Sequence, residues 1–165
     1  MSDTLDLSRT LGERLLARGW LLATAESCTG GGIASAVTDV SGSSAWFDRG
    51  FVTYSNAAKQ ELLGVPAATL DTHGAVSEAT ARAMASGALA RSAAQLTVAV
   101  TGVAGPSGGS PAKPVGTVWF GYAVAGGAVH ARLHRFDGDR AAVRARTVER
   151  ALLDLIQLAD GLAPA

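Results

Sequence analysis

Residues 20–37 read WLLATAESCTGGGIASAV. The stretch begins with a short apolar run, passes through a polar turn with three glycines, and ends in a segment of small and apolar residues. The run over 20–25 is typical of a buried strand, and the segment over 29–37 is predicted to be a helix. A strand that leads through a glycine-rich turn into a helix is the repeating unit of α/β domains.

The same alternation continues through the first two thirds of the chain and ends in a hairpin. Apolar spacing and turn residues predict further helices over 5–18, 56–63, 77–94 and 140–158, and further strands over 47–54, 96–103, 115–124 and 128–136. Gly126 and Gly127 separate the last two strands, as in a β-hairpin. We therefore expect one three-layer α/β/α domain over 1–165, with a mixed, mostly parallel sheet.

The composition excludes several classes of protein. Lysine plus arginine and aspartate plus glutamate number 14 each, so no net field favours nucleic acid or an anionic membrane. The single cysteine, Cys28, forms no internal disulfide, which fits a reducing compartment. The first residues do not resemble a secretory signal, and no apolar stretch is long enough to span a membrane. We expect a cytoplasmic protein without nucleic-acid or membrane partners.

Two interpretations fit the turn after the first strand. Ser27 is a candidate nucleophile at the carboxyl end of a strand, where free N–H groups of the next helix bind a phosphate or stabilise an oxyanion. Alternatively, Ser27 or Thr29 only caps that helix. The residues of this stretch alone leave the two interpretations open.

Cys28 is a weaker candidate for the nucleophile than its neighbour. Cysteine hydrolases use a histidine base, and none of His73, His130 and His134 has a sequence relation to Cys28. We interpret these histidines as structural or surface residues, and Cys28 as a small buried apolar side chain.

A serine without a histidine needs another base, and Tyr54 and Lys59 are candidates. They lie at the end of the strand predicted over 47–54 and in the helix after it. If this strand neighbours the one before Ser27, both side chains lie at the same edge of the sheet, and a desolvated lysine can accept the serine proton. Taken alone, the residues favour a solvated Lys59 and a half-buried Tyr54.

A third stretch, TGVAGPSGG (101–109), follows a predicted strand and suits a backbone cradle for an anion. It is neither a P-loop nor a dinucleotide-binding fingerprint. Further on, Arg140 begins the last predicted helix and has the fork that binds phosphate in two places. No HExxH, CxxC or tight His/Asp cluster is present, so we expect no metal site.

Several of these stretches together resemble one family. They are AESCTGG (25–31), GSSAWFDRGFVTYSNAAKQELLGV (42–65), HGAVSE (73–78), TGVAGPSGG (101–109) and KPVGTVWFGYA (113–123), and they resemble the CinA C-terminal domain family in order and over most of the chain. The resemblance implies a nicotinamide-nucleotide amidase, which hydrolyses the carboxamide of nicotinamide mononucleotide to nicotinate mononucleotide and ammonia for pyridine nucleotide recycling. It implies no cofactor or metal.

The resemblance also implies roles for particular residues. Ser27 would be the nucleophile, with Lys59 and Tyr54 as its activating partners. The residues implied in substrate binding are Thr29, Gly30 and Gly31 as N–H donors, Thr101, Gly102, Ala104 and Gly105 as the pocket lining, and Arg140 as the phosphate ligand. A homodimer is a further expectation. The alternative is a nucleotide-binding module without catalysis, linked to competence or the response to DNA damage.

Overall fold

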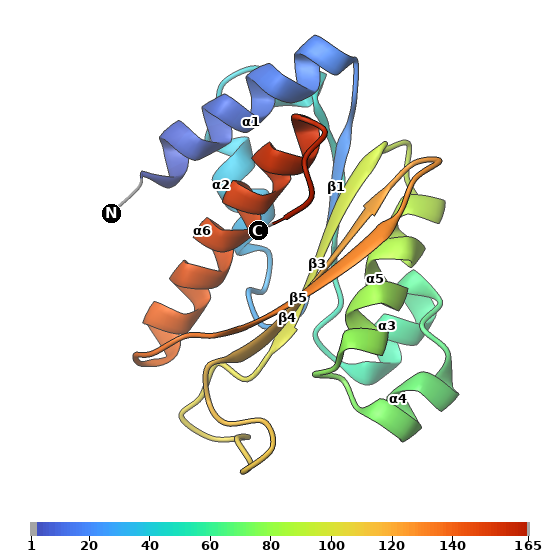
Figure 1. Ribbon diagram of the computed structural model, residues 1–165, viewed down its shortest axis with the longest axis vertical. Helices are drawn as coiled ribbons and strands as arrows, with labels where there is room; N and C mark the ends of the chain where they lie inside the picture. Colours follow the sequence, from blue (N-terminus) through green and yellow to red (C-terminus); the bar gives the residue numbers. More distant parts are fainter. Residues whose placement is uncertain (1–2, 165) are drawn as a thin grey trace.

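The computed structural model describes residues 3–164, in which a five-stranded sheet has helices on both faces (Figure 1). In chain order, the elements are α1 (Thr4–Arg18), β1 (Leu22–Glu26), α2 (Gly32–Thr38), the short 3₁₀ helix η1 (Ser43–Ala45), β2 (Phe47–Val52), α3 (Asn56–Leu63), α4 (Ala67–His73), α5 (Glu78–Ala90), β3 (Leu96–Gly102), β4 (Thr117–Val124), β5 (Val129–Arg135) and α6 (Arg140–Ala159).

The sheet is mixed, as predicted. Its strands lie in the order β2-β1-β3-β4-β5. β1 pairs in parallel with β2 and β3, whereas β4 pairs antiparallel with β3 and β5. Within residues 3–164, β4 is thus the one strand that runs against the others, and it forms the predicted hairpin with β5. The carboxyl ends of β2, β1 and β3 therefore meet at one edge of the sheet.

The helices form the two outer layers, which confirms the three-layer prediction. α1, α2 and α6 pack together on one face, and α5, with α3 and α4 beside it, covers the other (Figure 1). Asp139 caps α6, because its side chain accepts a hydrogen bond from the N–H of Ala142.

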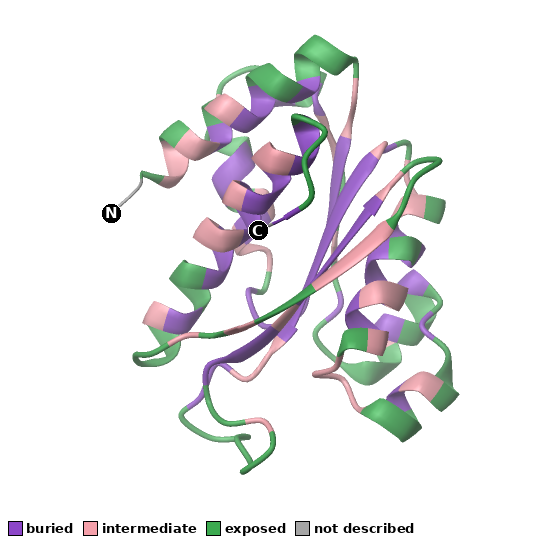
Figure 2. Ribbon diagram, in the orientation of Figure 1, coloured by how far each residue is buried: buried purple, intermediate pink, exposed green. Residues whose placement is uncertain are grey.

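Burial on both faces explains why the central strands β1 and β3 are rich in apolar residues (Figure 2). Successive side chains of a strand point to opposite faces. In β3, Val98 and Val100 belong to the core under α1, α2 and α6, whereas Ala99 belongs to the core under α5. The α5 side is lined by small residues: a Cβ added at Gly121 would lie 2.3 Å from the carbonyl oxygen of Ala81. This flat surface lets α5 pack closely against the sheet.

The largest differences from the predictions concern the start of α2, the end of α5 and the presence of α4. Gly30 and Gly31 have φ angles of 59° and 102°, which a right-handed helix does not allow, so α2 begins only at Gly32. α5 ends at Ala90, four residues before the predicted end at 94, because the chain turns there to enter β3. α4 was not predicted, since so short a helix shows little periodicity, and it places His73 at a helix end instead of in a loop.

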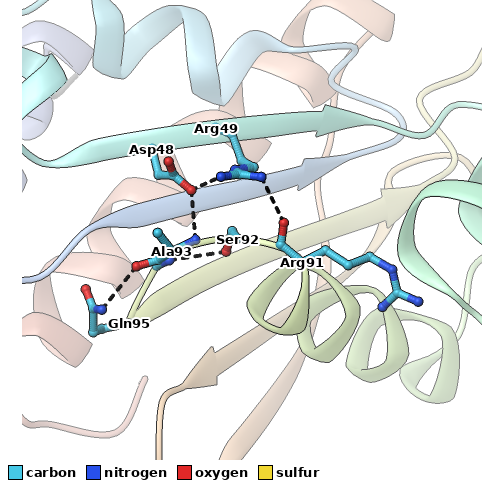
Figure 3. A network of polar contacts seen from close by, with 7 residues as sticks. Asp48, Arg49, Arg91, Ser92, Ala93 and Gln95 are labelled. Carbon is cyan, nitrogen blue, oxygen red and sulfur yellow. Dashed lines mark hydrogen bonds and ion pairs between the residues drawn. The ribbon is translucent and has the colours of Figure 1, made fainter.

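A polar network holds the edge strand β2 to the turn between α5 and β3 (Figure 3). The carboxylate of Asp48 accepts hydrogen bonds from the N–H of Ala93 (2.9 Å) and from Nε of Arg49 (2.7 Å). Arg49 in turn donates to the carbonyl oxygen of Arg91. The hydrogen bond from Ala93, with Arg49 next in importance, lowers the pKa of Asp48 below its ordinary value. The ionised carboxylate therefore stabilises this end of the fold.

We expect Asp48→Asn to lower the free energy of unfolding by about 1–2 kcal/mol near neutral pH, because it removes a charge that two donors satisfy. The folded-state pKa is the lower one, so this contribution is present above the unfolded pKa of about 3.9 and disappears as the pH falls through the folded-state value. Urea unfolding at neutral pH and at about pH 3 measures both effects.

Glu13→Gln is the matched control, because Glu13 is exposed on α1 and its side chain has no hydrogen bond or ion pair to another described residue. The free energy of unfolding should stay close to that of the unsubstituted protein at both pH values. An equal loss in the two variants would contradict the stabilising role of the network.

Candidate active site

A cavity of about 310 Å³ lies at the sheet edge where β1, β2 and β3 end. The segments that follow these strands supply most of its wall, as expected for ligand sites in open α/β sheets. Its lining comprises Ser27 and Cys28 after β1; Tyr54, Asn56 and Lys59 after β2; Ala75 and Val76 before α5; Thr101, Gly102, Val103, Ala104, Gly105, Ser107 and Gly108 at the end of β3 and beyond it; and Arg140 of α6.

The central contact of the cavity joins Ser27 and Lys59. Nζ of Lys59 lies 3.0 Å from Oγ of Ser27, although the residues are 32 positions apart in the chain. Lys59 is 1% exposed, so its amine is withdrawn from water. Burial lowers the pKa of Lys59 below its ordinary value, because desolvation disfavours the charged form. A desolvated lysine beside the serine hydroxyl is the arrangement expected if the strand before Tyr54 neighbours the strand before Ser27, and β1 and β2 are neighbours.

Two backbone carbonyls fix the direction of the lysine amine. Nζ of Lys59 donates to the carbonyl oxygens of Thr53 (3.0 Å) and Tyr54 (3.3 Å). A neutral amine has two N–H groups and one lone pair. When the two carbonyls accept both N–H groups, the lone pair is left for the hydroxyl proton of Ser27. The three acceptors match the three N–H groups of the charged amine, and the same geometry leaves a neutral amine with its lone pair toward Ser27, as a base requires.

The local structure explains how Lys59 reaches this position. The N–H of Thr53 donates to the carbonyl oxygen of Glu26, which continues the pairing of β2 with β1. Ser55 then caps α3 by accepting from the N–H of Ala58. Lys59 lies one turn into this helix, on its buried side. Because β1 and β2 are neighbours, the helix directs the lysine toward the end of β1.

Tyr54 and Arg140 form a pair at the rim of the cavity. Nη2 of Arg140 donates to the phenolic oxygen of Tyr54 (3.0 Å), and Nη1 donates to the carbonyl oxygen of Gly105 (2.9 Å). Tyr54 is 59% exposed. Among the described residues, its phenol has no hydrogen bond to Ser27 or Lys59, so the geometry gives it contact with Arg140 instead of a direct place in proton transfer.

Four residues at the end of β3 and beyond it were expected to line a pocket. All four lie in the wall of the cavity, namely Thr101, Gly102, Ala104 and Gly105. Thr101 directs its hydroxyl to the carbonyl oxygen of Ala75, which holds the wall together. A Cβ at Gly102 would come within 2.8 Å of backbone and side-chain atoms of Thr117 and Val118, so only glycine fits. Contact of these residues with a substrate stays a prediction.

Thr29, Gly30 and Gly31 lie outside the cavity wall. The Thr29 hydroxyl donates to Glu26, and the N–H of Gly30 donates to the carbonyl oxygen of Ser27 (3.0 Å). The hydroxyl of Thr29 and the N–H of Gly30 are therefore engaged within the protein, whereas the N–H groups of Thr29 and Gly31 donate to no oxygen of the described residues. The role of these N–H groups as donors to a ligand stays a prediction.

The sequence interpretation missed Glu26, which caps α2. Its carboxylate accepts from the N–H groups of Ile33 (2.7 Å) and Ala34 (3.0 Å). The Ncap residue is Gly31, which has no side chain to act as a cap. The alternative in which Ser27 or Thr29 caps the helix is therefore wrong. The expectation that the N–H groups of this helix bind an external anion is wrong for these two donors.

Arg144 was also missed. Nε of Arg144 donates to the carbonyl oxygen of Cys28, and Nη2 donates to that of Thr29, both at 3.2 Å. It lies one turn after Arg140 in α6. This long-range contact, from a residue more than 110 positions away, ties the turn after β1 to the last helix.

Cys28 is buried, as predicted, with 5% of its surface exposed. Burial raises the pKa of its thiol to about 11. The thiol is therefore protonated near neutral pH, which disfavours Cys28 as the nucleophile, since the thiolate is the reactive form.

No histidine lines the cavity among residues 3–164. The same part of the chain contains no group of three histidine, cysteine, aspartate or glutamate side chains arranged to hold a metal ion. None of its helices is both long enough and apolar enough to cross a membrane.

Comparison with known proteins identifies the family of the chain. Residues 4–159 match the model of the CinA C-terminal domain. The chain is 59% identical over 139 residues to nicotinamide-nucleotide amidohydrolase PncC of Enterobacter agglomerans (84% of this chain and 85% of that protein), and 53% identical over 156 residues to PncC of Escherichia coli strain K12 (94% of each). The crystal structure of a competence/damage inducible protein from Agrobacterium tumefaciens superposes with a TM-score of 0.92 at 49% identity, over 96% of both chains. With a matched sequence, fold and relatives, the chain belongs to the CinA C-terminal domain family.

Proposed function

We propose that this chain, an amide hydrolase of its family, converts nicotinamide mononucleotide to nicotinate mononucleotide and ammonia. The observation that carries the proposal is the 3.0 Å contact between Oγ of Ser27 and the buried amine of Lys59 in a cavity wall. A nucleophile within hydrogen-bond reach of an oriented base is the arrangement that acyl transfer requires. The PncC relatives, which are more than half identical, support the choice of substrate.

The reaction proceeds through an ester of Ser27. Its hydroxyl oxygen attacks the carboxamide carbon while Lys59 accepts the hydroxyl proton. The C–N bond then breaks, and the nitrogen leaves as ammonia with the proton that Lys59 returns. A water molecule, activated by the same amine, attacks the ester carbon. This second step releases the carboxylate product and restores the Ser27 hydroxyl.

The N–H of Cys28 is the best-placed donor for the oxyanion. It directly follows the nucleophile, and it donates to no oxygen of the described residues. The N–H of Ser27 donates to Val100 and that of Gly30 to Ser27, so neither is available. One such donor contributes about 3 kcal/mol to transition-state stabilisation.

Arg140 binds the phosphate at the rim in this proposal. Its guanidinium has five N–H groups, of which Gly105 and Tyr54 accept two. Three remain for an anion, and the protein contacts hold the fork in a fixed direction. Tyr54 thus orients Arg140, while Lys59 alone handles the proton.

The second candidate, a nucleotide-binding module without catalysis, is less well supported. Binding a nucleotide does not require a buried amine directed at a serine hydroxyl. The proposed partner is a small nucleotide, with no nucleic acid, membrane, metal or organic cofactor involved. Cytoplasmic localisation and a homodimer stay predictions.

We expect Ser27→Ala to lower the turnover of nicotinamide mononucleotide about 10⁴-fold or more, because the covalent step is lost. Cys28→Ala should retain turnover, because the thiol is protonated and takes no part in the reaction. Ammonia release by purified protein without added metal measures both. Full activity of Ser27→Ala, or loss of activity in a folded Cys28→Ala variant alone, would contradict a serine nucleophile.

A base of lowered pKa predicts the pH dependence of the reaction. kcat/KM should rise with pH as Lys59 loses its proton, and should level off below the ordinary lysine pKa of about 10.4. Lys59→Arg should lower kcat at least about 100-fold at every pH, since a guanidinium stays charged. Initial rates across the pH range measure this, with circular dichroism to verify folding. A flat profile, or an active and folded arginine variant, would exclude Lys59 as the base.

A further inference from the structure

The carboxylate of Glu26 lies directly behind the nucleophile and is 1% exposed. It accepts three hydrogen bonds. Oε1 accepts from the hydroxyl of Thr29 (2.6 Å) and from the N–H of Ile33 (2.7 Å), and Oε2 accepts from the N–H of Ala34 (3.0 Å). Two of the donors belong to the first turn of α2, and the third belongs to the turn that contains Ser27.

The bond between Thr29 and Glu26 closes the chain across the nucleophile. Glu26 is the last residue of β1, so its backbone is fixed by pairing with β2 and β3. Ser27 and Cys28 lie between the two hydrogen-bonded residues. The bond from the N–H of Gly30 to the carbonyl of Ser27 completes the turn. These two bonds therefore fix the backbone conformation of the turn that places Ser27 after β1.

The backbone of Glu26 also supports the base. Its carbonyl oxygen accepts from the N–H of Thr53 (2.8 Å), and the carbonyl oxygen of Thr53 accepts from Nζ of Lys59 (3.0 Å). The side chain of Glu26 thus holds the turn that contains Ser27, and its backbone carbonyl holds Thr53, whose own carbonyl orients the amine of Lys59. The two groups that must lie 3.0 Å apart are positioned from the same residue.

We propose that Glu26 and Thr29 are positioning residues that hold Oγ of Ser27 against the amine of Lys59, an inference that rests on the proposed amidase activity. Neither side chain lines the cavity, so neither contacts the substrate. Loss of their bond therefore lowers kcat and leaves KM nearly unchanged. A displacement of about 1 Å in reacting groups costs up to about 100-fold in rate.

The test uses two substitutions of Thr29, one that removes the hydroxyl and one that keeps it. Thr29→Val keeps the shape of the side chain and removes the donor to Glu26, whereas Thr29→Ser keeps the donor. We expect Thr29→Val to lower kcat about tenfold or more with KM within about twofold, and Thr29→Ser to restore kcat to near wild type.

Thr97→Val is the matched control for stability. Thr97 is fully buried, and its hydroxyl donates to the carbonyl oxygen of Ala85 (2.8 Å) near the start of β3, away from the cavity. Like Thr29→Val, this substitution removes a buried hydroxyl donor, here from a backbone carbonyl and there from a carboxylate. We expect a comparable loss of thermal stability with unchanged kcat, because Ser27 stays in place.

A second readout does not depend on nicotinamide mononucleotide. A fluorophosphonate loses fluoride to an activated serine and forms a phosphonate ester, and intact-mass spectrometry measures its rate of addition to Ser27. Thr29→Val should react about tenfold more slowly than wild type and Thr97→Val at the wild-type rate.

The outcomes separate the two proposals. Wild-type kcat and labelling rate in Thr29→Val, or an equal loss of kcat in Thr29→Val and Thr97→Val, would overturn the positioning role and leave the amidase proposal standing. Slow labelling of Thr29→Val in a protein that releases no ammonia from nicotinamide mononucleotide would support positioning and reject the substrate.

Discussion

The withdrawal of one lysine amine from water is the constraint on which the site depends. A buried amine is costly unless its hydrogen-bonding groups find partners. The partners of Lys59 are two carbonyls just beyond β2 and the hydroxyl of Ser27 just beyond β1. Those partners converge only because β1 and β2 are parallel neighbours whose carboxyl ends coincide. The sheet order is thus a condition for the chemistry, and the burial that lowers the lysine pKa suits it to act as a base.

The turn after β1 shows how an α/β fold can use a helix N-terminus without offering it to a ligand. In many such folds the first N–H groups of the helix bind a phosphate. Here the carboxylate of Glu26 accepts two of them, and Arg144 binds the adjoining carbonyls. Arg140, the proposed phosphate ligand, lies one turn earlier in α6. Of these two arginines, Arg144 holds the turn that contains Ser27, and Arg140 lies at the rim of the cavity.

Local patterns were sufficient for most of the architecture. The strands with both faces buried are rich in apolar residues, and the hairpin carries its glycine pair. The errors have local causes as well. Left-handed glycines delay α2, and α4 is too short to show a period. Periodicity alone does not distinguish a lysine that points inward from one that points outward. The family motifs, rather than periodicity, therefore favoured Lys59 as an active-site residue over a solvated surface residue.

The sequence by itself determined the layers, the family and the identity of Ser27 and Lys59 as a pair, because these follow from local periodicity and from motifs that are contiguous in the chain. Only the tertiary structure decided how that pair is held. Glu26 lies at the end of an apolar strand without a capping motif, Arg144 acts across more than 110 positions, and Tyr54 meets Arg140 across 86. The physical reason is that such contacts depend on strand order and on the direction in which each helix leaves the sheet. Neither the strand order nor the direction of the helices can be inferred from the spacing of neighbouring residues.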